Sequence, residues 1–157
     1  MNNPIAYILV GVPGSGKSTW INNQMFDWNN TVVASTDNHV DQEARRQGKT
    51  YNDVWQSTMP AAVQHMAQTV RDAVRDGLNI VWDQTSTAVP ARAKKLRMLP
   101  RNYRKIAVVF PTPDDKELAR RLANRPGKNI PDSVMKQMIS GFVMPTKEEG
   151  FDEIRVI

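Results

Sequence analysis

The chain has 157 residues, 40% of them hydrophobic and 24% charged, which are the proportions of a globular domain with a sizeable core. It lacks cysteine, which excludes disulfides and thiolate metal centres, and its two histidines are too few and too far apart to suggest a zinc site. No signal peptide opens the sequence and no apolar run has the length of a membrane span. We therefore expect no membrane association and a cytoplasmic location, in the host cytoplasm if the chain is viral.

The chain is basic, with 21 lysines and arginines against 16 acidic residues and a net charge of +5. The excess concentrates in residues 84–113, which contain no acidic side chain. Such a stretch is either a solvated helix face followed by the start of a strand, or a surface that binds phosphodiester backbones. Its charged residues are Arg92, Lys94, Lys95, Arg97, Arg101, Arg104 and Lys105.

The first element is an apolar, β-favouring run at residues 5–10, which predicts a buried parallel strand. The pattern G-x-x-x-x-G-K-[ST] follows it, and then residues with helical spacing, which is the context that a phosphate-binding loop needs. Glycines let the backbone approach an anion, so that its N–H groups surround the phosphates of ATP. We expect Lys17 to reach the β- and γ-phosphates and the Ser18 hydroxyl to bind Mg²⁺. The predicted nucleotide-binding residues of this loop are Gly11, Val12, Pro13, Gly14, Ser15, Gly16, Lys17, Ser18 and Thr19.

A second short strand is predicted at residues 31–34, and Asp37 follows it. An acidic residue just past the C-terminal end of a strand lies where open α/β sheets bind their ligands. The alternative role is to cap the helix that follows, because aspartate is favoured at that position. Position alone does not separate these two roles.

A long amphipathic helix is predicted at residues 54–74, with Gly77 as its stop. Pro60 should either start the main part of this helix or kink it. We expect Trp55 and the methionines of the helix to lie in the core, and we assign no role to His65.

The next predicted strand, residues 78–83, ends in Asp83. P-loop enzymes place at this position a carboxylate that holds Mg²⁺ directly or through water. The alternative role of Asp83 is to cap the following turn. Gln84 stands where many P-loop ATPase motors have a water-activating glutamate, so the sequence favours phosphoryl transfer to an acceptor over hydrolysis.

The second half of the chain contains a basic helix from about residue 89, a strand at 106–110 and a last strand at 153–157. Thr112 as cap and Pro113 at the first helical position predict another helix between these strands, and Arg120, Arg121 and Arg125 lie toward its end. Residues 120–131 suit a mobile lid that brings arginine to the transferring phosphate, or else form an ordinary exposed turn. Because strands and helices alternate, we expect one α/β domain over residues 1–157, with a parallel sheet and helices on both faces.

On these residues the chain resembles the kinase domain of the polynucleotide kinase family, in both its phage and its animal forms. The phosphate-binding loop alone is generic, whereas the lid and the tail are more specific. The resemblance implies a P-loop kinase fold with a helical lid. It rests on residues 11–20, Asp37 and residues 81–86, 117–125, 130–135 and 144–154.

The resemblance also implies roles for particular residues. The family counterpart of Asp37 is the general base that takes the proton of the acceptor hydroxyl. Arg125 would stabilise charge on the γ-phosphoryl group, and Arg121 matches a second lid arginine. ATP and Mg²⁺ would be the cofactors, with Ser18 and Asp83 at the metal. Nucleic acid, and DNA above all, would be the substrate.

The residues expected around the acceptor depart from the family pattern. Residues 35–37 read Ser-Thr-Asp where members often have Asn-Arg-Asp, and residues 83–86 read Asp-Gln-Thr-Ser where they often have Asp-Asn-Thr-Asn. Val40 stands in place of an arginine that helps to hold the substrate of the phage enzyme. The nucleotide half of the pattern is intact, and the acceptor half has changed.

Three hypotheses therefore remain. The first is a kinase for a hydroxyl on nucleic acid, either a 5′-OH end or the hydroxymethyl group of a modified pyrimidine such as 5-hydroxymethyluracil in DNA. The second is a kinase for a small molecule such as a nucleoside, and salt-sensitive DNA binding separates it from the first. The third is a nucleotide-dependent switch or nucleic-acid-binding module, which binds ATP without a labelled product.

Overall fold

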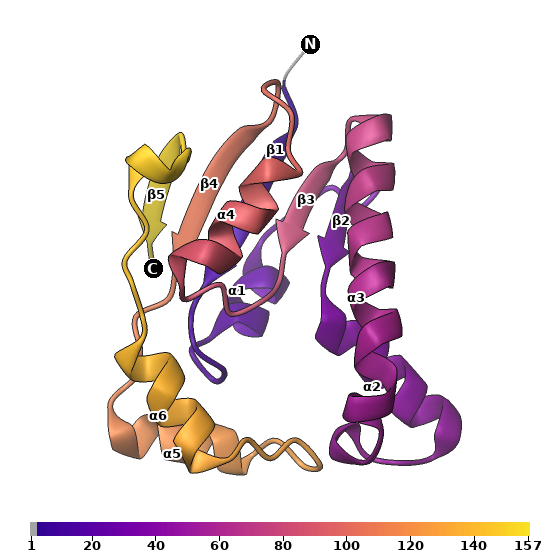
Figure 1. The fold of residues 1–157 in the computed structure, drawn as a ribbon, viewed down its shortest axis with the longest axis vertical. Helices are drawn as coiled ribbons and strands as arrows, with labels where there is room; N and C mark the ends of the chain where they lie inside the picture. Colours follow the sequence, from indigo (N-terminus) through magenta and orange to yellow (C-terminus); the bar gives the residue numbers. More distant parts are fainter. Residues whose placement is uncertain (1–2) are drawn as a thin grey trace.

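Five parallel strands form one sheet in the computed structural model, which describes residues 3–157 (Figure 1). The strand order is β2-β3-β1-β4-β5, so β1 lies at the centre and pairs with β3 and β4. The strands are β1 (Ile5–Val10), β2 (Thr31–Ala34), β3 (Asn79–Trp82), β4 (Arg104–Val109) and β5 (Glu153–Val156). The helices are α1 (Lys17–Asn23), α2 (Thr36–Gln47), α3 (Tyr51–Asp76), α4 (Val89–Arg97), α5 (Asp115–Ala123), α6 (Asp132–Ser140) and the 3₁₀ turn η1 (Lys147–Glu149).

The sheet is covered on both faces, which confirms the predicted α/β architecture. Successive side chains of a strand point to opposite faces, so Ile8 and Leu9 enter different clusters. Ile8 packs with side chains of α3 and α4, whereas Leu9 packs with Ile21 of α1. Figure 1 shows α4 crossing the near face of the sheet, with α1 behind it. Because β1, β2 and β3 are parallel, the loops that follow them lie at the same end of the sheet.

Helix α3 begins earlier than predicted. Thr50 caps it, in a capping box with Asp53, and the helix continues through Pro60, which therefore does not start it. The expectation that Trp55 lies in the core is wrong, because its side chain is 44% exposed. Val54 takes the inward position and packs against α2, and the next residue is rotated by about 100° around the helix axis.

The basic stretch is not a continuous surface. Arg92 is fully buried and Lys95 is 8% exposed, because these two residues share the inward face of α4. Arg92 forms a two-point ion pair with Glu149 of η1, with nitrogen–oxygen distances of 2.8 and 3.1 Å, and donates to the carbonyl of Ser86. The exposed face that the sequence indicated keeps Lys94 and Arg97.

Helices α5 and α6 form a separate layer below the sheet edge in Figure 1. Leu118 of α5 and Met135 of α6 bury Val12 of the loop after β1 between them. Asp114, not the predicted Thr112, caps α5 and accepts a hydrogen bond from the Glu117 amide. No helix within residues 3–157 is long and apolar enough to span a membrane.

Candidate active site

The loop between β1 and α1 borders a cleft of about 860 Å³. Gly14 and Gly16 have φ angles of +82° and +106°, which side-chain-bearing residues rarely adopt. The amide of Gly11 donates to the carbonyl of Thr85 at 2.9 Å, which fastens the loop to the segment after β3. The predicted residues that line the cleft are Pro13, Gly14, Ser15, Gly16, Lys17, Ser18, Thr19, Asp37, Asp83, Arg121 and Arg125.

Gly11 and Val12 are the two predicted loop residues that do not line the cleft. Both are buried, and Val12 packs against helices α5 and α6. A Cβ atom added to Gly11 would lie 2.9 Å from the Cβ of Phe110, so this glycine serves the packing under the loop. The sequence pattern did not separate positions that face the cleft from positions that hold it.

Lys17 lies across the loop. Its ammonium group donates to the carbonyls of Gly11 and Val12, at 2.8 and 2.9 Å. Burial lowers the pKa of Lys17 to about 8, while the nearby carboxylate of Asp83 opposes this shift. The lysine is thus positively charged at neutral pH and is held where an anion in the loop would meet it.

Ser18 and Asp83 line the same cleft, and together they fit a magnesium ion. Burial raises the pKa of Asp83, and Lys17 opposes the shift. One carboxylate, one hydroxyl and phosphate oxygens are the donors that Mg²⁺ uses in nucleotide sites. Asp83 does not cap α4, because Ala88 occupies the cap position.

Asp37 lies in the first turn of α2 and does not cap that helix. Ser35 is the cap, and its hydroxyl accepts from the amide of Asn38 at 3.3 Å. The hydroxyl of Tyr51 donates to Oδ1 of Asp37 at 2.7 Å. Burial, together with this hydrogen bond, raises the pKa of Tyr51, so the phenol remains a donor. Sequence reasoning missed Tyr51, which begins α3 immediately after its cap.

The lid arginines reach the cleft from α5 and from the loop after it. Arg121 donates to the carbonyl of Gly14 at 3.1 Å and to Glu117 at 2.8 Å. Nη1 of Arg125 is buried and has no hydrogen-bond partner among residues 3–157. A buried donor without a partner costs free energy, so this nitrogen is available for an acceptor on a bound molecule.

The loop after α5 is hydrogen-bonded to the start of α3. Asn52 donates to the carbonyl of Asn129 at 3.2 Å and accepts from its amide at 3.0 Å, and the Asn52 amide donates to the carbonyl of Gly127. Lys128 pairs with Asp41 of α2 at 2.8 Å. These contacts join the loop after α5 to α2 and α3, and no local sequence signal indicated them.

A second cavity of about 320 Å³ adjoins the cleft. Asp37, Asp83 and Arg125 line both spaces, so the two meet at these charged residues. The second cavity lies between the starts of α3 and α4 and the lid loop, and Pro13 of the phosphate-binding loop also lines it. Its further lining includes Thr36, Tyr51, Asn52, Ser86, Ala91, Lys95, Asn129 and Ile130.

Three of the positions that depart from the family pattern, Thr36, Gln84 and Ser86, line this second cavity. The side chain of Gln84 donates to the hydroxyl of Thr36 at 3.3 Å, so two of the changed residues contact each other. Ser86 has a φ angle of +47°, a left-handed conformation that costs free energy for residues other than glycine. Val40 is fully buried between α2 and α3 and does not line either space.

The two histidines lie closer than the sequence suggested. His39 of α2 and His65 of α3 are 26 residues apart, but packing of these helices brings their ring centres to 4.8 Å. Among residues 3–157, no group of three or more His, Cys, Asp or Glu side chains is placed to hold a metal ion.

The chain is similar to proteins of several functions. It is 29% identical over 158 residues to mouse heterogeneous nuclear ribonucleoprotein U-like protein 2, a match that covers 94% of this chain and 20% of that protein. The chain therefore spans about a fifth of the length of this curated relative.

Several solved structures share the fold, and three of them illustrate the range of proteins. A chain of the Pnkp1/Rnl/Hen1 RNA repair complex has a TM-score of 0.68 and 21% identity, covering 90% of this chain and 44% of its own. A chain of the PezAT toxin–antitoxin system of Streptococcus pneumoniae has a TM-score of 0.71 and 20% identity, and the match covers 99% of this chain and 67% of that chain. A gluconokinase from Sinorhizobium meliloti has a TM-score of 0.50 and 15% identity, and the match covers 100% of this chain and 83% of that chain. At these identities the likeness shows a P-loop kinase-like fold alone.

The family follows from the sequence match. Residues 7–145 match the AAA domain family, and this range runs from the first strand to the segment after α6. The match includes the phosphate-binding loop, Asp37, Asp83 and both lid arginines. The chain therefore belongs to the AAA domain family.

Proposed function

We propose that this protein is an ATP-dependent kinase that transfers the γ-phosphoryl group to a hydroxyl on nucleic acid. The observation that carries the proposal is the meeting of the two spaces at Asp37, Asp83 and Arg125. A nucleotide in the large cleft and an acceptor in the smaller cavity would face each other across these residues. A nucleotide switch has no need of the second space.

In the proposed reaction, Asp37 accepts the proton of the acceptor hydroxyl, and Tyr51 holds the carboxylate in place. The acceptor oxygen bonds to the γ-phosphorus while the bond from phosphorus to the β–γ bridging oxygen breaks, and ADP leaves. Lys17 and Arg125 neutralise the charge on the phosphoryl oxygens during transfer. Ser18 and Asp83 would hold Mg²⁺, which would supply positive charge next to the phosphates of ATP.

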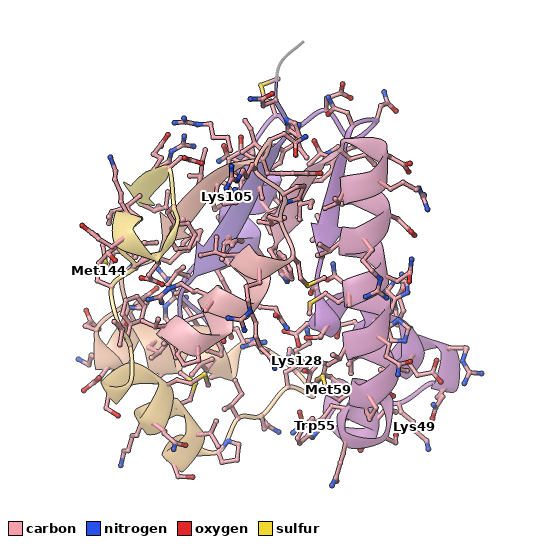
Figure 2. All side chains as sticks on the ribbon, turned by 45° about the horizontal axis from the view of Figure 1, so that its top comes forward. Lys49, Trp55, Met59, Lys105, Lys128 and Met144 are labelled. Carbon is pink, nitrogen blue, oxygen red and sulfur yellow. The ribbon has the colours of Figure 1, made fainter. Side chains whose placement is uncertain are left out.

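Charge and shape support a nucleic-acid acceptor. We call the smaller cavity the acceptor cavity. Three cationic side chains line it: Lys95, Arg125 and Lys128. Trp55 lies one helical turn beyond Tyr51 and is exposed, and aromatic rings of this kind stack on unpaired bases. Figure 2 shows Trp55 and Lys128 at the end of α3 that meets the lid loop. The neighbour from an RNA repair complex adds support at the level of fold.

A labelled-transfer experiment tests the proposal. [γ-³²P]ATP and Mg²⁺ are incubated with three acceptors at equal concentration: a 5′-OH oligonucleotide, an end-blocked duplex containing 5-hydroxymethyluracil, and free nucleosides. Lys17→Met serves as the control without a nucleotide site. The proposal predicts label on one of the two nucleic acids. Label on the oligonucleotide identifies an end kinase, and label on the blocked duplex identifies a base-hydroxymethyl kinase.

A small-molecule kinase is the second candidate. The acceptor cavity of about 320 Å³ favours it, because this volume is at the low end for ligand pockets. The gluconokinase neighbour has the same fold. Label on free nucleosides alone would replace the nucleic-acid proposal with this one, and ATP binding without any labelled product would leave the switch.

A further inference from the structure

Lys95 is a buried cation that the fold does not explain. Its side chain is 8% exposed, and its ammonium group lies 5.6 Å from the centre of the Trp82 ring. Among residues 3–157 it has no carboxylate partner, and the charged side chain that affects it most is its neighbour Lys94. Burial lowers the pKa of Lys95 to about 8, so the group keeps most of its charge at neutral pH. Such a residue costs stability unless an anion meets it.

The position of Lys95 indicates where that anion would come from. Lys95 lines the acceptor cavity but not the nucleotide cleft, so ATP does not supply it. The other two cations of the cavity have different tasks, because Lys128 pairs with Asp41 and Arg125 also lines the cleft. Lys95 is therefore the cation assigned to the acceptor side alone.

Ser86 gives a second, independent indication at the same place. Its side chain is 2% exposed, and its hydroxyl has no hydrogen-bond partner among residues 3–157. Ser86 lines the acceptor cavity together with Lys95, and the carbonyl bond from Arg92 fixes its backbone. A hydroxyl donor and an ammonium donor that line one cavity are groups that bind an anionic oxygen group.

We propose that Lys95 and Ser86 bind a phosphate group of the acceptor strand, on the nucleotide that carries the reacting hydroxyl. This inference rests on the proposed function and specifies its substrate class. The site selects acceptors that bear a phosphate over neutral nucleosides and sugars. Val40 is buried in the core, so on this account the cation that holds the acceptor comes from α4 rather than from α2.

Binding measurements test the site without requiring transfer. Deoxythymidine 3′-monophosphate and deoxythymidine are titrated into the ADP-bound protein by calorimetry. Wild type should bind the phosphorylated compound more tightly, and Lys95→Met should weaken that binding by about tenfold to hundredfold, since a hydrogen bond to a charged group is lost. Lys94→Met is the matched control from the exposed face of α4 and should leave binding unchanged. Deoxythymidine binding should not change in either variant.

Two further readouts separate a binding role from a structural one. Because Lys95 has no carboxylate partner among residues 3–157 and methionine can keep the contact with the Trp82 ring, Lys95→Met should unfold at the same temperature as wild type or higher. Ser86→Ala should weaken phosphate-dependent binding by several-fold while the fold persists. For transfer, the KM for a phosphate-bearing acceptor should rise and kcat should change little.

Each outcome decides the inference. If Lys95→Met lost affinity equally for the phosphorylated and the neutral compound, or lost no affinity for either, the phosphate site would be overturned. If no nucleic acid is labelled but binding of the 3′-monophosphate still depends on Lys95, the site stands and the proposed kinase function fails. Lys95-dependent binding of gluconate in place of the nucleotide would assign the site to a sugar acid and overturn the nucleic-acid substrate.

Discussion

Asp37 and Tyr51 show how a hydrogen-bonded pair arises from two helix starts. Asp37 lies in the first turn of α2 and Tyr51 is the first residue of α3, and the two helices pack against each other. The Tyr51 hydroxyl occupies Oδ1 of Asp37 at 2.7 Å, which orients the carboxylate. In the proposed reaction this leaves Oδ2 for the acceptor proton.

Replacement of Tyr51 by phenylalanine should lower kcat by about tenfold, because the hydrogen bond to the carboxylate that positions the base is worth about 1.5 kcal/mol. The affinity for ATP should not change. Tyr7→Phe is the matched control, since Tyr7 lies under the opposite face of the sheet. Steady-state kinetics with labelled ATP give both values, and an unaltered kcat in Tyr51→Phe would remove the positioning role.

We expect Lys17 to make ATP binding depend on pH. Its pKa is lowered to about 8 by burial, and the phosphates of ATP would favour the charged form and raise it. Below pH 8 the free enzyme already carries the proton, so affinity should be nearly constant. Above pH 8 binding takes up a proton, and affinity should fall by up to about tenfold per pH unit. Calorimetry in buffers of different ionisation enthalpy measures this uptake, and a flat profile to pH 9.5 would contradict it.

The lid loop is the element whose geometry depends most on contacts between distant segments. Gly127 has a φ of +74°, and a Cβ atom there would lie 2.7 Å from the Cβ of Thr50. Close approach of the two backbones permits the hydrogen bonds between Asn52 and residues 127–129. The sequence indicated a basic loop but not the segment that it contacts.

Gly127→Ala should release the lid loop from α3. The substitution combines the cost of a left-handed alanine, about 1–2 kcal/mol, with a clash against Thr50. Gly48→Ala isolates the first cost, because Gly48 has a φ of +66° and open space around its Cβ position. Hydrogen exchange of residues 124–131 should speed up in Gly127→Ala and not in Gly48→Ala. Equal protection in both variants would show that the contact does not hold the loop.

Over the whole molecule, the sequence predicted the features that depend on neighbouring residues and missed those that depend on contacts between distant segments. The strand positions, the phosphate-binding loop and the glycine stop of α3 follow from residue order, because each depends on neighbours within a few residues. The exposure of Trp55, the pairing of Lys128 with Asp41 and the acceptor cavity do not, because each joins segments far apart in the chain. Arg92 illustrates the limit, since a residue assigned to a solvated surface or a phosphodiester-binding surface is fully buried against Glu149.

The ion pair between Arg92 and Glu149 joins α4 to the C-terminal tail and should make stability depend on pH. Burial tends to raise the pKa of Glu149, but hydrogen bonds from Arg92 and the Thr146 amide outweigh it, and the net shift is downward. A lowered folded pKa means that the stabilisation is complete above the unfolded value, about 4.3, and is lost as pH falls through the folded pKa.

Arg92→Ala should lower the free energy of unfolding by about 3–5 kcal/mol at pH 7, because it leaves Glu149 without its partner. Glu149→Gln should reduce the acid sensitivity seen in wild type. Urea titrations between pH 3 and pH 7 measure both effects. Arg97→Ala, from the exposed face of the same helix, is the control and should change stability by less than about 0.5 kcal/mol. If Arg92→Ala lowered the free energy of unfolding no more than the control Arg97→Ala does, the account of this ion pair would be contradicted.

The most direct test of the central claim is single-turnover transfer by Asp37→Asn, with labelled ATP and the acceptor that wild type uses. Asparagine keeps the shape of the side chain but cannot take a proton at neutral pH. The account predicts that transfer falls by about 10²–10⁴-fold while the Kd for ATP and the unfolding temperature stay at their wild-type values. Transfer at the wild-type rate in Asp37→Asn would show that another group accepts the proton, and the assignment of this cleft and cavity to base-assisted phosphoryl transfer would fail.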